Sequence, residues 1–364
     1  MNMLDYLQWR GDIPFSACGL NEVDNLIFSS LAYLDLGGLV SADGSVSLTL
    51  SSLFEAYSRT GRAQNENSPD RPVLLKAAAE SVRFRDVALC RYINEIDTDK
   101  QIQFSAVTFR YLPDAAYIAF RGTDQTIVGW REDFNMSFLH ETPGQNAAAA
   151  YVNQIAAALP GRLTVGGHSK GGNFAVYAAA FCDPAVSARI GRVYSNDGPG
   201  FRQEITADER YLAILPKTEK IIPESSLVGI LLSGKEDRRV VKSSAKGMAQ
   251  HNPFTWCVMG AAFEEADERT KSSIFMDDTL SKWVASLSDD DLKTMFDAIF
   301  DSLDASGVKT LKDLQNNPFA TYTAFLKAIS KVDGRSEILG SVQKLLGSGM
   351  DVVKENIKSH GDKS

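Results

Sequence analysis

The spacing of apolar residues predicts three successive kinds of structure along the chain. Through residues 1 to about 100, apolar side chains recur at a helical period, as at positions 23, 26, 27, 31 and 34. From about residue 101, short apolar runs alternate with helical stretches, and after about residue 262 only amphipathic helical patterns remain. We expect one domain over 1–262 that begins with a helical segment over 1–100, and a helical C-terminal region over 263–364.

The middle of the chain carries the pattern of a layered α/β domain. Expected strands at 103–112 and 115–120 are joined by a tight Pro113-Asp114 turn, and further strands are expected at 162–167 and 189–194. Helices are expected at 143–159 and directly after 169. Strands that alternate with helices are typical of a mainly parallel sheet with helices on both faces.

The C-terminal region contains at least one clear helix signal. A capping box formed by Ser288 and Asp291 precedes an apolar face. That face comprises Leu292, Phe296, Ile299 and Leu303, and the pattern returns at Leu345, Leu346, Val352, Val353 and Ile357. We expect these helices to pack on the core domain or on a second copy of the chain, which would give a homo-oligomer. They lack the basic amphipathic face of a lipid-surface helix.

Charge and composition narrow the classes of partner. A net charge of -8 and a pI near 5.2 disfavour binding to nucleic acid or to an anionic membrane surface. No stretch approaches the roughly 20 apolar residues of a membrane-spanning helix, and the N-terminus lacks the basic and apolar regions of a signal peptide. A cytoplasmic protein without an integral membrane segment is expected.

The four cysteines do not have the spacing of a metal site. Cys18, Cys90, Cys182 and Cys257 lie far apart, without a Cys-x-x-Cys pair or a Cys/His ligand pattern. We interpret them as buried small hydrophobic residues. Neither a metal nor an organic cofactor is expected.

A candidate nucleophile lies between an expected strand and an expected helix. Residues 167–171 read Gly-His-Ser-Lys-Gly and fit the pattern Gly-x-Ser-x-Gly. The five letters alone are a weak signal, but the strand before them and the alanine-rich helix after them are the context that the chemistry requires. The glycines allow close backbone passage around a strained serine, so we expect Ser169 to be a nucleophile whose developing oxyanion faces the backbone N–H of Lys170. A glycine-rich connecting turn is the structural alternative.

Only four histidines can serve as the base. His168 lies beside the nucleophile and should point away from its hydroxyl, His140 precedes it, and His360 lies in the polar tail. His251 remains, and its place after Ser169 suits the order of serine, acid and histidine in α/β-hydrolases. We expect His251 to be the general base.

The acid has more than one candidate. Asp197 follows the expected strand at 189–194 and would project from the carboxyl edge of the sheet, where such sheets carry their sites. An Asp in this Gly/Pro-rich turn can also simply bond its own backbone. Glu219 and Glu224, on either side of Ile-Ile-Pro at 221–223, are rivals. We take Asp197 first and Glu224 as the alternative.

A second turn is expected to complete the site. Thr123, which follows Phe120-Arg121-Gly122, can supply a second oxyanion donor through its backbone or its hydroxyl. Behind it, Ile127, Trp130 and Phe134 form an apolar stripe at helical spacing. A short amphipathic helix beside an active site can act as a lid, and ordinary core packing explains the same stripe equally well.

These motifs resemble the class 3 (fungal-type) lipases. The resemblance rests on a strand that ends in Phe-Arg-Gly-Thr, a Trp-containing helix with a following Asp, and the Gly-His-Ser-x-Gly elbow. It is closer to a bacterial branch of lipase-like proteins with a domain of unknown function, in which the blocks at 5–12, 119–124, 129–133, 197–201 and 250–254 recur. The resemblance covers residues 1 to about 260.

The resemblance implies an α/β-hydrolase fold with a serine triad that acts on acyl esters. Ser169 would match the nucleophile, His251 the base, and Thr123 with Lys170 the oxyanion donors. Class 3 lipases place an Asp shortly before an apolar pair and a proline, whereas here Lys220 holds that place, so the acid has moved, been replaced or been lost.

Three functions are compatible with these residues. The leading expectation is a serine hydrolase that cleaves acyl or lipid-like esters through an acyl-enzyme intermediate. An acyltransferase or a thioesterase would use the same triad. A non-catalytic hydrolase-like binding protein would keep the pocket without the chemistry.

Overall fold

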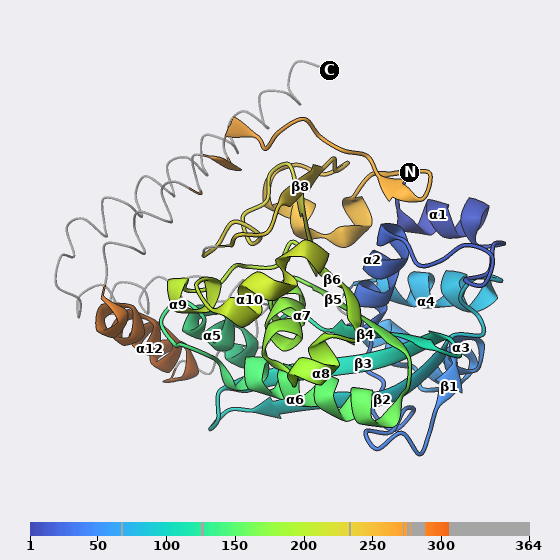
Figure 1. Ribbon diagram of the computed structural model, residues 1–364, viewed down its shortest axis with the longest axis horizontal. Coiled ribbons are helices and arrows are strands. Elements are labelled where there is room, and N and C mark those ends of the chain that lie inside the picture. Colours follow the sequence, from blue (N-terminus) through green and yellow to red (C-terminus); the bar gives the residue numbers. More distant parts are fainter. Residues whose placement is uncertain are drawn as a thin grey trace. The chain divides into compact units, whose positions relative to one another are not determined.

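The computed structural model describes residues 1–66, 68–124, 127–232, 234–271, 273–274, 277 and 288–305. The chain divides into two compact units, Met1–Asp277 and Asp278–Ser364. The first unit contains all the strands of the described residues, and its elements follow each other as shown in Figure 1.

The first unit has the following elements. The helices are α1 (Met3–Arg10), α2 (Glu22–Leu31), α3 (Leu50–Arg59), α4 (Asp70–Glu80), α5 (Ile127–Asn135), α6 (Pro143–Ala158), α7 (Lys170–Phe181), α8 (Pro184–Ser187), α9 (Gln203–Thr206) and α10 (Glu209–Ile214). The strands are β1 (Leu48–Thr49), β2 (Ala88–Asp97), β3 (Ile102–Leu112), β4 (Ala115–Phe120), β5 (Arg162–His168), β6 (Ile190–Asn196), β7 (Thr218–Pro223), β8 (Arg238–Val241), β9 (Val258–Met259) and β10 (Ala262–Phe263). Short 3-10 helices occupy Arg62–Asn65, Leu215–Lys217, Gly247–His251 and Pro253–Thr255.

The sheet has 8 strands in the order in which they occur along the chain, β1 to β8. Strands β1 to β4 pair antiparallel, and β4 to β8 pair parallel. The expected strands at 103–112, 115–120, 162–167 and 189–194 are confirmed as β3, β4, β5 and β6, and the expected helices as α6 and α7. This arrangement confirms the predicted α/β-hydrolase fold.

The segment over 1–100, which was predicted to be mostly helical, ends in a strand. Residues 88–97 form β2, which pairs with β3 from Ala88↔Arg110 to Asp97↔Ile102. Charged and polar side chains follow one another in the second half of β2, and that half is half-buried or exposed. Its strand conformation is therefore set by pairing with the almost wholly buried β3, and a local apolar period cannot reveal it.

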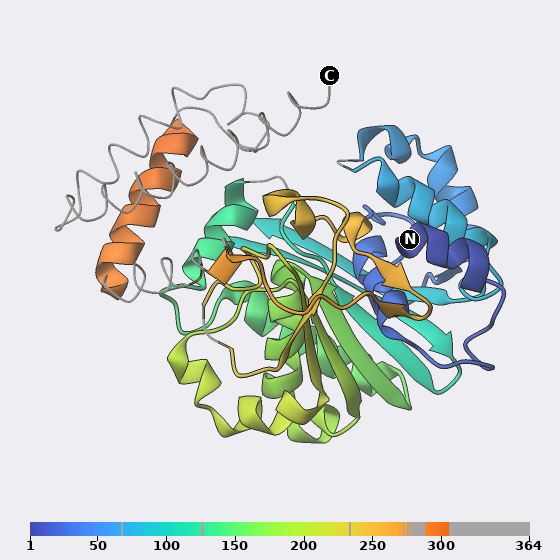
Figure 2. The ribbon, with the colours of Figure 1, turned by 90° about the horizontal axis from the view of Figure 1, so that it is seen from above.

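The N-terminal helices cover one face of the sheet. Right-handed crossovers between successive parallel strands place their helices on a single face, so the opposite face needs cover from elsewhere. One apolar core joins the N-terminal helices to β2–β4, with Phe28 of α2 stacked on Phe109 and near Tyr117. A second core joins α6, α7 and α10 to the other face. Figure 1 shows α4 and α6 on opposite sides of the sheet, and Figure 2 shows the blue helices gathered at one end of it.

The first unit extends beyond residue 262 because the chain there remains bonded to the sheet. The backbone N–H groups of Glu264 and Ala266 donate to Cys257 and Val240, and that of Thr270 donates to Glu224. The first compact unit ends at Asp277.

In the second unit, the structure describes one helix, α12 (Asp289–Ala305). Ser288 and Asp291 form the expected capping box, since Ser288 Oγ accepts the N–H of Asp291 at 3.1 Å and the Asp291 carboxylate accepts the N–H of Ser288 at 3.4 Å. Leu292, Phe296 and Leu303 are buried. The further apolar pattern at 345–357 lies outside the described residues.

Two expectations from composition can be compared with the fold. All four cysteines are free, but only Cys182 is buried; the other three are half-buried. Small side chains at the margins of the sheet and loops stay partly exposed, so the expectation of four buried cysteines is wrong for Cys18, Cys90 and Cys257. Among the described helices, none is long and apolar enough to span a bilayer.

Candidate active site

The register of the sheet brings three chain turns to one edge. Phe120 lies opposite Gly167, and His168 lies opposite Asn196. The residues that follow these strand ends therefore meet at the carboxyl edge of the parallel strands. They are the turn 121–124, Ser169 and Asp197.

Ser169 has the geometry of a nucleophile elbow. Its backbone has φ 60° and ψ -133°, between the last residue of β5 and the first residue of α7. A positive φ is strained for a residue with a side chain, and it is held here by backbone bonds from Ser169 N–H to Asn196 and from Gly172 N–H to Ser169. Although Ser169 is the N-cap of α7, its side chain makes no capping bond. The hydroxyl is thus left for other chemistry.

The flanking glycines are required by contact as well as by conformation. A Cβ atom on Gly171 would lie 2.1 Å from the carbonyl oxygen of Phe120, and one on Gly167 would lie 2.3 Å from that of Gly171. These are backbone atoms that cannot move aside cheaply. The structure therefore explains why both positions of the motif carry no side chain.

Asp197 and His251 meet beside the elbow. Their Oδ2 and Nδ1 atoms lie 2.7 Å apart; the carboxylate is fully buried, and the imidazole is 32% exposed. The other carboxylate oxygen, Oδ1, accepts the hydroxyl of Ser226 at 2.5 Å and the N–H of Gly229 at 3.1 Å. Burial by itself would raise the pKa of Asp197, but the bond to His251 and the further donors hold that pKa below its usual value. The site therefore contains a charged carboxylate aimed at Nδ1 of a histidine.

The segment that carries His251 is held in place by hydrogen bonds of its neighbour Gln250. Trp256 is fully buried and donates its Nε1–H to the carbonyl oxygen of Gln250 at 2.9 Å. The Gln250 side chain accepts the N–H of Ser225 at 2.7 Å. Within the described part of the chain, Ser169 Oγ and His251 make no hydrogen bond to each other; such bonds often tighten only when substrate is present.

The other histidines do not compete for the role of base. His168 is buried, with Nδ1 3.0 Å from the Tyr33 hydroxyl and Nε2 2.8 Å from the carbonyl oxygen of His251. Burial and the neighbouring His251 lower the pKa of His168 to about 3. His140 is exposed, and His360 lies outside the described residues.

Neither of the rival carboxylates occupies the place of Asp197. Glu219 pairs with Arg192. Glu224 lies at the strand end, where its backbone bonds Val241 and Thr270. Of the three candidate acids, Asp197 is the one that the described structure joins to His251.

The turn after β4 lies against the elbow. A Cβ on Gly122 would be 3.0 Å from Ser169 Cβ, so this turn approaches the serine closely. The hydroxyl of Thr123 donates to Asp133 Oδ2 at 2.5 Å. Burial raises the pKa of Asp133 to about 6, against the lowering effect of the Lys170 charge and the Thr123 bond. The hydroxyl of Thr123 is therefore committed to Asp133, and its backbone N–H is the group left to serve as an oxyanion donor.

Lys170 projects away from the candidate oxyanion position into a buried network. Its Nζ donates to Glu132 Oε2 at 2.9 Å and to Gln103 Oε1 at 2.6 Å, and neither charged side chain is more than 1% exposed. Glu132 also accepts the N–H groups of Gln103 and Gly144. Helix α5 is thereby tied to β3, α6 and α7.

This network corrects the expected faces of α5. The predicted apolar stripe ends in Phe134, but Phe134 is 38% exposed and the charged Glu132 is fully buried. A helix-period pattern cannot anticipate a lysine on another helix that neutralises a buried glutamate. The buried ion pair favours core packing over a mobile lid for this helix.

Sequence reasoning overlooked three residues at this site: Tyr33, Glu132 and Asp133. Tyr33 gave no signal because it is 136 positions from Ser169 by residue number. A lysine directly after the nucleophile, at the buried start of a helix, was the available hint that a buried acid must lie nearby.

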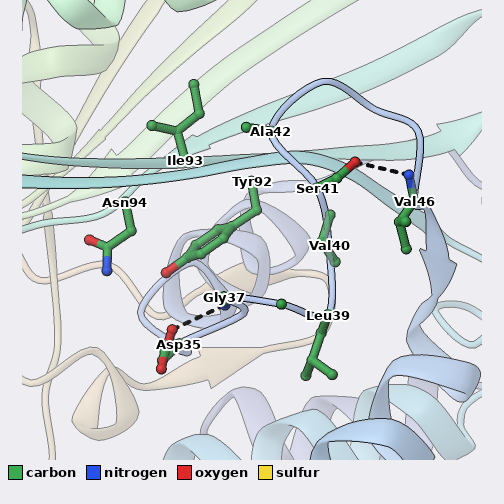
Figure 3. A pocket seen from close by; sticks show the side chains of 11 residues that line it. Asp35, Gly37, Leu39, Val40, Ser41, Ala42, Val46, Tyr92, Ile93 and Asn94 are labelled. Atoms are coloured by element: carbon green, nitrogen blue, oxygen red, sulfur yellow. Dashed lines mark hydrogen bonds between the residues drawn. The ribbon is translucent and has the colours of Figure 1, made fainter.

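The structure also contains a pocket of about 510 Å³. It is lined by segment 35–46 and by Tyr92, Ile93 and Asn94 of β2 (Figure 3). None of Ser169, Asp197 and His251 is among its lining residues. In the described residues there is no group of three or more His, Cys, Asp or Glu side chains that could hold a metal ion.

Comparisons with known proteins identify a family and similar solved structures. A family model described as Mbeg1-like matches residues 78–301, more than half of the 364 residues. Among solved structures, the chain is similar to the native Rhizomucor miehei lipase propeptide complex, with TM-score 0.38 and 15% identity over 70% of this chain and 76% of that one. It is also similar to M37 lipase, with TM-score 0.34 and 13% identity over 56% and 68%. No curated protein matches the sequence.

Proposed function

This chain is a member of the Mbeg1-like family, and we propose that it is a serine hydrolase that cleaves acyl esters. The observation that carries the proposal is the 2.7 Å hydrogen bond between Asp197 and His251 at the sheet edge from which Ser169 projects. A buried carboxylate that orients a partly exposed imidazole beside an elbow serine is the arrangement that nucleophilic acyl transfer needs.

In the proposed reaction, His251 Nε2 accepts the proton of Ser169 Oγ as that oxygen attacks the ester carbonyl. Asp197 bonds Nδ1–H, which fixes the ring orientation and stabilises the imidazolium. The backbone N–H groups of Lys170 and Thr123 are the proposed donors to the oxyanion, helped by the positive end of α7. The alcohol leaves with the proton from His251, and water then releases the acyl group by the same steps.

A fluorophosphonate probe tests the nucleophile. The wild-type protein should be labelled, Ser169→Ala should not, and His251→Gln should be labelled far more slowly. Ser187→Ala is the control, because its hydroxyl bonds the Ala179 carbonyl on the flank of α7. A wild-type protein that stays unlabelled while a known serine hydrolase reacts would instead indicate a hydrolase-like binding protein. Label that persists in Ser169→Ala would place the nucleophile elsewhere.

Product analysis tests the acyl acceptor. With p-nitrophenyl esters in buffer, a hydrolase gives free acid at a rate that added alcohol changes little. An acyltransferase gives mainly the new ester once an alcohol is present, and a thioesterase prefers the matching thioester. Predominant formation of ester or cleavage of thioester would overturn the assignment as an ester hydrolase while leaving Ser169 as nucleophile.

A further inference from the structure

Tyr33 connects the N-terminal segment to the elbow. It follows α2, and its hydroxyl oxygen lies 3.0 Å from His168 Nδ1 and 3.3 Å from the His168 carbonyl oxygen. A Cβ on Gly122 would lie 2.1 Å from the same hydroxyl oxygen and 3.0 Å from Ser169 Cβ. One hydroxyl thus contacts both chain turns that the proposed oxyanion hole is built from.

The contacts of His168 fix which of its nitrogens carries the proton. The carbonyl oxygen of His251 can only accept a hydrogen bond, so Nε2 of His168, at 2.8 Å, must donate. Burial lowers the pKa of His168 to about 3, so near neutral pH the ring holds a single proton. Nδ1 is then an acceptor, and the Tyr33 hydroxyl is its donor.

The hydrogen bonds therefore run in one direction, from the Tyr33 hydroxyl to the His168 ring and from that ring to the backbone carbonyl of His251. We call this pair of hydrogen bonds the relay and Tyr33 and His168 its members. Burial raises the pKa of Tyr33 to about 12, against the lowering effect of Arg71 and Arg121. The Arg71 guanidinium of α4 lies over the Tyr33 ring, 4.3 Å from its centroid. Neither member of the relay changes its protonation near neutral pH.

We propose that Tyr33 is a positioning residue for the proposed reaction: through His168 it holds the backbone of His251 where the base imidazole can reach Ser169. The proposal rests on the proposed function of Ser169, His251 and Asp197. Asp197 controls the ring of His251 through Nδ1, whereas the relay controls the main chain that carries the ring. Because Tyr33 lies before the family match at 78–301, the N-terminal segment completes the active site.

The kinetics of a Tyr33 variant distinguish a positioning role of the hydroxyl from a role in stability alone. Tyr33→Phe keeps the ring under Arg71 but removes the donor to Nδ1 of the buried His168, so the imidazole loses the hydrogen bond that anchors it on this side. A displaced base slows the chemical step and leaves ground-state binding intact, so kcat for a p-nitrophenyl ester should fall about ten- to hundredfold with KM unchanged within about twofold. The matched control is Tyr151→Phe, which loses a buried hydroxyl bond to Thr108 on a different part of the sheet.

A double-mutant cycle tests the path through His168. His168→Gln places an amide N–H close to the former Nε2 and has no Nδ1 for the Tyr33 hydroxyl to bond, so Tyr33→Phe should cost no more than about twofold in that background. Losses that multiply in the double variant, or a Tyr33→Phe enzyme with the kcat of Tyr151→Phe, would overturn the proposal.

Nitrogen-15 NMR of the histidine rings gives a readout that does not depend on activity. In the wild-type protein His168 should show a single Nε2–H tautomer that does not titrate between pH 5 and 9, and in Tyr33→Phe the Nδ1 resonance should move towards that of a nitrogen that accepts no hydrogen bond. A wild-type Nδ1–H tautomer would refute the relay even in an active enzyme. A protein that shows the expected tautomer but neither reacts with fluorophosphonate nor cleaves esters would refute the proposed function and leave the relay standing.

Discussion

Glu132 and Lys170 form an ion pair in which both side chains are buried from solvent. Glu132 Oε2 and Lys170 Nζ are 2.9 Å apart, and the two side chains are 0% and 1% exposed. A pair buried to this degree is costly to break, since the remaining charge would lose both its partner and its access to water. The pair holds the elbow helix α7 against α5.

The two halves of this pair should differ in their effect on stability. Glu132→Ala removes the closest carboxylate from Lys170, which keeps the two Gln103 oxygens and Asp133 at 3.8 Å. It also leaves the N–H groups of Gln103 and Gly144 without their acceptor, and it should lower the free energy of unfolding by about 3–5 kcal/mol. Lys170→Met leaves Glu132 with two amide donors and should cost about 1–3 kcal/mol. Urea unfolding measures both. Lys242→Met, which breaks an exposed pair with Glu264, should cost less than about 1 kcal/mol. Equal losses for Glu132→Ala and Lys170→Met would contradict this account.

Replacement of the proposed acid should abolish most activity. Asp197→Asn offers Nδ1 of His251 an amide in place of a charge, which favours the wrong tautomer, and kcat should fall on the order of 10⁴-fold. Glu224→Gln is the matched control and should retain activity, because Glu224 has been placed outside the Asp197–His251 pair. Steady-state ester hydrolysis decides; a larger loss in Glu224→Gln than in Asp197→Asn would reverse the assignment.

Acid should destabilise the fold through His168. In the unfolded chain His168 takes up a proton below about pH 6.5, whereas in the native protein its pKa is about 3. Between those values the unfolded state holds more protons, so stability falls as pH is lowered from 6.5 towards 3, by on the order of 5 kcal/mol from this residue. Urea unfolding at pH 7, 6, 5 and 4 should therefore show a steep loss.

Two variants isolate that contribution. His168→Gln should remove most of the slope between pH 6.5 and 4, and His140→Gln, at an exposed histidine, should preserve it. Asp133 acts in the opposite sense, because its pKa is raised to about 6 and its native state takes up a proton first as pH falls. Asp133→Asn should consequently steepen the loss. An unchanged slope in His168→Gln would show that other groups govern acid sensitivity.

Glycine 171 should tolerate no side chain. In Gly171→Ala the new Cβ would meet the Phe120 carbonyl oxygen at 2.1 Å, so β4 and α7 must separate, and we expect a loss of about 1–3 kcal/mol or more together with loss of fluorophosphonate labelling. Gly19→Ala is the control, since nothing lies within 4 Å of its Cβ position. Thermal unfolding should distinguish the two, and a neutral Gly171→Ala would be inconsistent with the close approach.

The central part of the fold could be predicted from the sequence because its signals are local. The local sequence patterns of the run from Arg162 to Gly167 and of the alanine-rich stretch after Ser169 predict a strand and a helix. Parallel pairing of the strands then brings the residues that follow them to the carboxyl edge of the sheet. Strand β2 was not predicted from the sequence because its conformation depends on pairing with β3. A pairing partner distant in space leaves no mark on a polar stretch such as 94–97.

The residues of the candidate site also separate into those with a local sequence signal and those without one. His251 could be singled out among four histidines, and Asp197 could be inferred from its place after a strand. The buried Glu132 and the hydroxyl of Tyr33 could not, because each acts through a residue that the sequence places far away. Side chains whose role is to hold another side chain carry no pattern of their own.

The order of strands in the sheet has a consequence for synthesis of the chain on the ribosome. Each strand from β1 to β8 neighbours the one that precedes it, so a nascent chain can add every new strand to an edge that has already left the exit tunnel. The growing edge remains open to wrong partners until the next strand arrives. Since His251 follows β8, a chain that ends between β8 and residue 251 would contain all eight strands of the sheet and Ser169 but would lack the proposed base.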